Sequence, residues 1–171
     1  MKLKIDLNAK LADIQHYFRI YPEIIEQSRN HIKENLDSSI FSFYGMTISE
    51  FLQLQENKMP KKIEALLANK NTTLKTYIKI LNTFESGAKS FEAIIERTSI
   101  EQSIEERIAS TNLLSMTAEE TMLSFVKEYF NLNNFEQAQN ITIYEYIIAK
   151  KIHYNNVMFQ KNMTEQQKNK I

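Results

Sequence analysis

The sequence predicts an all-α fold, an irregular bundle of about seven to eight helices with a short extended arm at the N-terminus. Gly and Pro each occur twice among 171 residues, whereas all-β proteins need many turns made from these residues. Apolar residues recur at helical spacing along most of the chain. Three Thr-x-x-Glu patterns, beginning at Thr47, Thr117 and Thr142, are typical of capped helix starts.

The composition limits the classes of partner. Lys and Arg total 21, as do Asp and Glu, so no net field draws the chain onto nucleic acid. The absence of Cys excludes disulfides, zinc–thiolate sites and thiol catalysis. No apolar run reaches the roughly 18 residues that span a bilayer, and no signal peptide opens the sequence. We therefore expect no membrane partner and a cytoplasmic location.

The sequence also lacks a recognisable reaction centre. His16, His31 and His153 each stand outside the spacings typical of metal ligands. Gly45 and Gly87 are isolated, so no phosphate-binding loop can be assigned. No Ser/His/Asp arrangement stands out either. The sequence predicts that the protein is no enzyme, with no catalytic, cofactor-binding or metal-binding residue and no small-molecule substrate.

The N-terminal residues alternate between polar and apolar, which is a strand pattern. Leu3, Ile5 and Leu7 are the apolar members. No convincing second strand follows, so one interpretation is an extended arm or the fraying start of the first helix. The other is a strand that pairs with a partner chain, in which case Leu3 and Ile5 bind that partner.

Two helices follow the arm. Asn8 can cap the first, in which Leu11 and Ile14 share one face. Pro22 ends this helix or starts the next, because Pro suits the first helical turn. The second helix is predicted to extend to Leu36, before a polar break.

An aromatic loop over residues 40–45 is the main candidate for partner binding. Phe41, Phe43 and Tyr44 lie within six positions of one another. If exposed, they would form a binding patch, because aromatic side chains supply much of the energy of protein interfaces. The alternative is that they fill the end of a helical core.

The middle of the chain is predicted to hold three helices. Thr47 with Glu50 caps one that ends near residue 57, and Pro60 starts another. The third carries apolar residues at i, i+3, i+4 and i+7 spacing over residues 74–84.

A helical connector is predicted after Gly87, over residues 88–110. Its two apolar stripes lie well apart around an ideal helix. Either the connector breaks near Thr98 and Ser99, or its two ends contact different neighbours.

The helix that begins after Thr142 is the predicted centre of the fold. Ile141 and Tyr146 stand at the two positions of a hydrophobic staple. The next two turns are apolar on nearly every side, and such a helix is normally buried all round. It is predicted to continue through Phe159, and residues 164–171 are expected to fray.

Two segments of the chain resemble each other. An amphipathic helix, a loop with aromatic residues and a stapled capping box occur over residues 32–51 and again over 126–146. This similarity indicates either a duplication or the ordinary recurrence of capped helices. We expect a single domain over residues 1–171. Under duplication, related halves 8–85 and 116–163 are joined by the connector 88–110.

The last helix suggests an alternative function. Lys150, Lys151, His153 and Lys161 gather there with Tyr154. They indicate either a small nucleic-acid-binding regulator or a solvated helix end whose lysine stems cover apolar surface.

The chain is rich in Asn, Lys and Ile, has no Trp, and reads Met-Thr-Ala-Glu-Glu and Thr-Ile-Tyr-Glu-Tyr near its end. In these features it resembles small helical proteins of tailed bacteriophages with AT-rich genomes. Residues 116–161 look like the tail-assembly chaperones and connector proteins of such phages. The resemblance implies an interaction protein that acts in assembly, in the host cytoplasm or the virion. Its partners would be further copies of itself or phage structural proteins.

Overall fold

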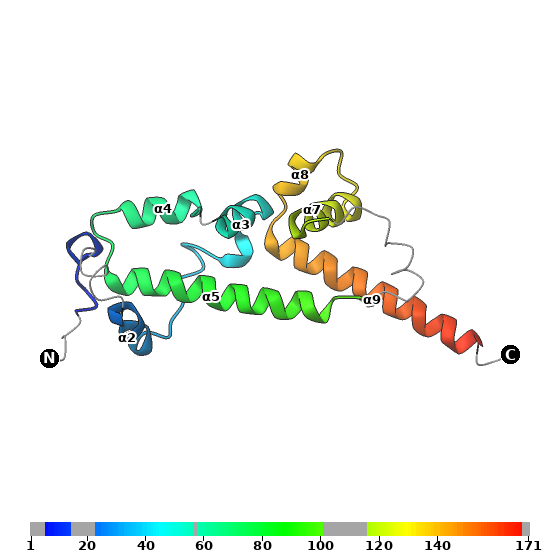
Figure 1. Ribbon diagram of the computed structural model, residues 1–171, viewed down its shortest axis with the longest axis horizontal. Helices are drawn as coiled ribbons and strands as arrows, with labels where there is room; N and C mark the ends of the chain where they lie inside the picture. The colour runs from blue at the N-terminus through cyan, green and yellow to red at the C-terminus, as the bar shows by residue number, and fades with distance from the viewer. Residues whose placement is uncertain (1–5, 15–22, 57, 101–115, 169–171) are drawn as a thin grey trace. The chain divides into compact units, whose positions relative to one another are not determined.

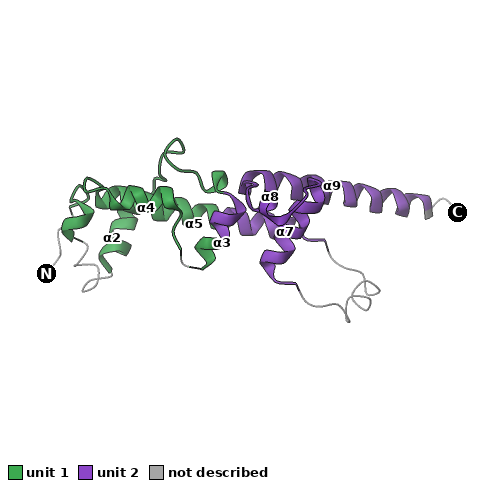
Figure 2. Cartoon of the chain, turned by 90° about the horizontal axis from the view of Figure 1, so that it is seen from above, with its two compact units in different colours: residues 1–46, 53–89 green, residues 47–52, 90–171 purple. Residues whose placement is uncertain are grey.

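A computed structural model describes residues 6–14, 23–56, 58–100 and 116–168. Over these ranges the protein is all-α, as predicted, and two isolated β-bridges are the extended pairings that it contains (Figure 1). The chain divides into two compact units (Figure 2). Unit 1 comprises residues 1–46 and 53–89, and unit 2 comprises residues 47–52 and 90–171. No helix in the described ranges is long and apolar enough to cross a membrane.

Unit 1 is built on the first two-thirds of the long helix α5. Its helices are α2 (Glu23–His31), the 3₁₀ turn η1 (Phe43–Gly45), α4 (Lys61–Ala68) and the part of α5 (Leu74–Arg97) that ends at residue 89. Ile32, Leu74 and Ile78 form a buried core cluster, against which Leu7 and Ile14 pack. Of the residues whose spacing predicted the buried face of α5, Leu74 and Ile78 are buried and Leu81 and Phe84 are half-buried, while Ile80, outside that spacing, is buried as well.

Helix α2 is shorter than the sequence predicted, because α5 supplies other partners for the backbone that follows it. The amide Nδ2 of Asn82 donates to the carbonyl oxygen of Ile32 at 2.8 Å. The backbone N–H of Leu36 donates to the hydroxyl of Thr83 at 2.8 Å. Ile32 and Leu36 remain buried, but they reach the core from a segment without regular secondary structure.

Helix α5 runs through Gly87 without a break, which corrects the prediction of a separate connector beginning there. A Cβ at Gly87 would lie 2.2 Å from Cγ of Phe43. Gly87 is thus required by the close approach of the Phe43 ring to α5, and it does not interrupt the helix. The helix ends at Arg97, next to the break that was one alternative at Thr98 and Ser99. Residues 101–110 of the predicted connector lie outside the described ranges.

Unit 2 contains the remaining helices. They are the start of α3 (Ile48–Gln55), the end of α5, α7 (Ala118–Tyr129), α8 (Phe135–Gln139) and α9 (Ile143–Lys168). All three predicted capping boxes form, those of α3, α7 and α9. Helix α9 ends at Lys168, so residues 164–168 are helical where fraying was expected. Within this unit, the C-terminal half of α9 extends past α7 and α8 (Figures 1 and 2).

Candidate interaction surface on helix α9

The start of α9 is fixed by its cap. The backbone N–H of Thr142 donates to Oε2 of Glu145 at 2.8 Å, and the N–H of Glu145 donates to the Thr142 hydroxyl at 3.2 Å. The backbone N–H of Thr142, and then its hydroxyl, hold the pKa of Glu145 below its usual 4.5. The carbonyl of Ile141 accepts from the backbone N–H of Ile48 at 2.8 Å. These bonds satisfy backbone groups that a helix end leaves open.

One face of the first two turns of α9 is buried in unit 2. Ile143, Tyr146, Ile147 and Ala149 have between 0% and 6% of their surface exposed. The Tyr146 ring contacts Phe125 of α7 at a centroid distance of 5.8 Å and Phe91 of α5 at 6.0 Å. Burial raises the pKa of Tyr146 to about 12. This face is the core that the sequence predicted.

The Phe125 ring also holds the next turns of α9. Its centroid lies 4.7 Å from Nζ of Lys150 and 5.5 Å from the His153 ring. Burial lowers the pKa of Lys150. A cation above an aromatic face is attracted by the ring quadrupole, so Lys150 serves the packing of unit 2. Lys151 and Lys161 of the same helix are exposed, and the nucleic-acid alternative stays a hypothesis.

The opposite face of α9 is exposed and apolar. We call it the apolar stripe, and its exposed fractions are Tyr144 59%, Ile148 37%, Ile152 44%, Phe159 65% and Met163 43%. Residues three or four apart lie on the same side of a helix. At 100° per residue, the five side chains fall within an arc of about 100°. The expectation that this helix is buried all round is therefore wrong for this face.

Residues 159–167 at the end of α9 are not covered by the described part of their own chain. Every residue from Phe159 to Gln167 is exposed. A helical segment of this length is marginal in water by itself, because isolated helices below roughly 12–15 residues are hardly stable. Two large apolar side chains, Phe159 and Met163, nevertheless stand on it.

The predicted partner-binding loop lies elsewhere and is mostly buried. Phe41 and Phe43 are 6% and 4% exposed, and Tyr44 is half-buried. Phe41 packs on Phe84 of α5 at a centroid distance of 5.1 Å, while Phe43 covers Gly87. The loop thus fills the core of unit 1, the second of the two alternatives, and the assignment of Phe41 and Phe43 to a binding patch is corrected. Leu3 and Ile5 lie outside the described residues.

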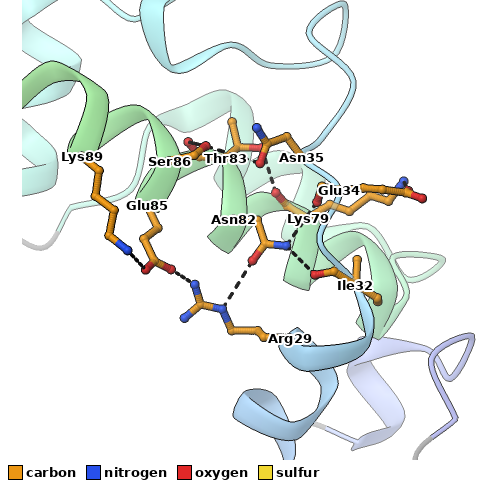
Figure 3. A network of polar contacts seen from close by, with 10 residues as sticks. All are labelled: Arg29, Ile32, Glu34, Asn35, Lys79, Asn82, Thr83, Glu85, Ser86 and Lys89. Atoms are coloured by element: carbon orange, nitrogen blue, oxygen red, sulfur yellow. Dashed lines mark hydrogen bonds and ion pairs between the residues drawn. The ribbon is translucent and has the colours of Figure 1, made fainter.

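A polar network in unit 1 is the other feature considered as a site (Figure 3). It borders a cleft of about 360 Å³ lined by residues from α2, α5 and the segment between them. Glu85 pairs with Arg29 and, at 2.7 Å, with Lys89, and Lys79 pairs with Glu34. Positive and negative groups thus neutralise one another across the network. Exposed ion pairs of this kind contribute little stability, and we assign them to the packing of α2 on α5.

The described ranges hold no group of three or more His, Cys, Asp or Glu residues that could bind a metal ion. Comparison of the chain with models of protein families, with curated proteins and with solved structures found no match. The exposed apolar face of α9 is the candidate site that remains in the described part of the chain. The sequence carries the signal of this face in large apolar residues on both sides of one helix, a pattern that is also typical of a helix buried all round.

Proposed function

We propose that the protein is a non-enzymatic interaction protein that acts in assembling a larger complex, and that it binds its partner through the apolar stripe of α9. The observation that carries this proposal is the exposure of Tyr144, Ile148, Ile152, Phe159 and Met163 along one face of one helix. Apolar residues exposed singly are normal, whereas several large ones along one face of a single helix are typical of a surface that a partner covers.

The size of the stripe supports the proposal. At roughly 200 Å² per large side chain, the exposed fractions correspond to about 500 Å² of surface. This is near the upper end of the largest patches on monomeric proteins, which are themselves often functional. A helix that lies its apolar face against another protein is also a recurrent mode of recognition.

The exposed end of α9 gives a second, independent reason. A partner that covers Phe159 and Met163 would supply the tertiary contacts that residues 159–167 lack in the described part of the chain. The stripe would then explain the all-round apolar pattern near the start of the helix. One face belongs to the core of unit 2 and the other belongs to the interface.

The setting we propose is a tailed-phage virion or its assembly. This part of the proposal depends on the resemblance of residues 116–161 to tail-assembly chaperones and connector proteins, and that segment contains most of α9. The partners would then be phage structural proteins or further copies of the chain.

The experiment compares the size of the complex that contains the protein in extracts of cells that naturally make it. A stripe variant carries Ile148→Ser and Phe159→Ser. A control variant carries Gln160→Ser and Lys161→Ser, two exposed positions of α9 outside the stripe. We expect wild type and control to elute in a large assembly and the stripe variant to elute at the mass of one chain.

Far-UV circular dichroism of the purified variants checks that both remain folded. The proposal is overturned if wild-type protein elutes at the mass of one chain. It is equally overturned if the folded stripe variant stays in the assembly.

A further inference from the structure

We propose that the apolar stripe is covered by a second copy of this chain, whose α9 packs against it in the antiparallel direction. The inference rests on the proposed function and names its partner. It is drawn from the spacing of the stripe, the supported and unsupported ends of α9, and the area available.

The intervals between the residues of the stripe are symmetric about its middle. Including the exposed Asn155, its positions are 144, 148, 152, 155, 159 and 163, with intervals of four, four, three, four and four residues. Two such helices in antiparallel orientation place Tyr144 opposite Met163 of the second copy and Ile148 opposite its Phe159. Each large apolar side chain at the two ends of the stripe thus meets another, and the two-fold symmetry repeats both contacts.

The way α9 packs within its own unit favours an antiparallel arrangement of the two α9 helices. The first turns of α9 are held by Phe125 and Phe91 through Tyr146, whereas residues 159–167 are exposed on all sides. Antiparallel packing lays each unsupported end on the supported first turns of the other copy. Parallel packing would instead pair two unsupported ends and align the two helix dipoles unfavourably.

The area places the pair among weak, reversible associations, at the lower limit of specific interfaces. Two stripes remove roughly 1,000 Å² of apolar surface from water, and the polar positions beside them add to this. Specific interfaces begin at about 1,200 Å² in total. Helix α9 spans about 39 Å over its 26 residues, so the contact can extend over more than five turns.

Asn155 lies near the middle of the stripe, opposite Ile152 of the second copy. A polar side chain buried against an apolar one without a hydrogen-bond partner costs free energy. Replacing it with an apolar residue should therefore tighten association, a result that misfolding cannot imitate.

The first test measures the mass of the purified full-length protein by light scattering over a range of concentrations up to about 100 µM. We expect a dimer that dissociates on dilution. Asn155→Leu should lower the dissociation constant at least about tenfold, since two copies of the change enter the seam. Phe159→Ser should raise it by a similar factor or more.

The second test determines the direction. The chain has no Cys, so introduced thiols are the only ones present. A mixture of Ile148→Cys and Phe159→Cys proteins should form the mixed disulfide, while each variant alone should form little. Disulfides formed by each variant alone, with no mixed product, would overturn the antiparallel arrangement.

The self-pairing is overturned if the wild-type protein is a monomer at every concentration and the Asn155→Leu protein is a monomer as well. Suppose that the purified protein does not self-associate, but the stripe variant is lost from the large assembly in cell extracts. The proposed function then stands, and the protein that covers the stripe is a different one. If the stripe variant remains in that assembly, the proposed function itself fails. The two failures are thus distinguishable.

Discussion

Thr47 and Thr142 face each other in an antiparallel β-bridge, although 95 positions separate them in the chain. Each is the first residue of a capping box, and the two boxes belong to the segments that resemble each other in sequence. The bridge places the starts of α3 and α9 side by side in unit 2. A related pair of segments in mutual contact fits a duplication, which stays a hypothesis.

The α9 cap gives the first prediction. Thr142→Ala removes the hydroxyl that accepts from the N–H of Glu145, and loss of such a cap costs about 1 kcal/mol. The matched control is Thr164→Ala in the same helix, whose hydroxyl donates only to the Gln160 carbonyl that is already in the helix ladder. Urea unfolding followed by circular dichroism should show the loss for Thr142→Ala alone. Equal losses in both variants would contradict the role of the cap.

The same cap predicts a pH dependence. The folded-state pKa of Glu145 lies below 4.5, so the unfolded chain binds more protons in acid than the folded one. The contribution of this carboxylate is therefore present at neutral pH and is lost as pH falls below about 4.5 through the folded pKa.

Glu145→Gln removes this titration. Between about pH 6 and pH 3.5, the free energy of unfolding should fall further for wild type than for the variant. All other carboxylates are shared by the two proteins, so their contributions cancel in the comparison. Identical losses would show that the cap does not favour the charged form.

Gly87 gives a prediction about stability that is opposite to what helix propensity alone would predict for Gly87→Ala. Ala is favoured over Gly inside a helix by about 1 kcal/mol, yet a Cβ at Gly87 would collide with the Phe43 ring. Gly87→Ala should thus lower the free energy of unfolding by about 1–3 kcal/mol. In the control Gly45→Ala, the added Cβ meets Ser42 at 3.7 Å, an ordinary contact. A more stable Gly87→Ala protein would refute the packing described for Phe43.

Thr83 gives a prediction about the segment after α2. Thr83→Val keeps the shape of the side chain but leaves the buried N–H of Leu36 without its acceptor. An unsatisfied buried donor costs about 1–3 kcal/mol. Thr98→Val is the control, because the equally buried Thr98 hydroxyl donates only to carbonyls of its own helix. Denaturation curves that shift by the same amount would count against this role of Thr83.

Local patterns were enough to predict much of the fold. The boxes at Thr47, Thr117 and Thr142 form because their hydrogen bonds join residues three apart, so no distant contact is needed. The buried face over residues 74–84 followed from its period. These features depend on the chain within one or two turns, which is why the sequence revealed them.

The errors arose where a distant residue decided the outcome. Gly87 was expected to separate two helices, but the Phe43 ring, far away in sequence, requires a glycine there. Periodicity shows that residues 143–149 are apolar on nearly all sides. It does not show whether other helices of the same chain cover all of these sides. The exposed stripe thus escaped prediction, while buried Phe41 and Phe43 were assigned to a binding surface.

The most direct measurement of the central claim is photo-crosslinking in the cells that make the protein. A photoreactive phenylalanine analogue replaces Phe159 in the stripe or Lys161 outside it, and mass spectrometry identifies each adduct. The account predicts a specific adduct at position 159 and none at 161, with the peptide containing Ile148 of a second copy as the linked segment. No adduct at 159, or the same products at both positions, would contradict a partner on the stripe.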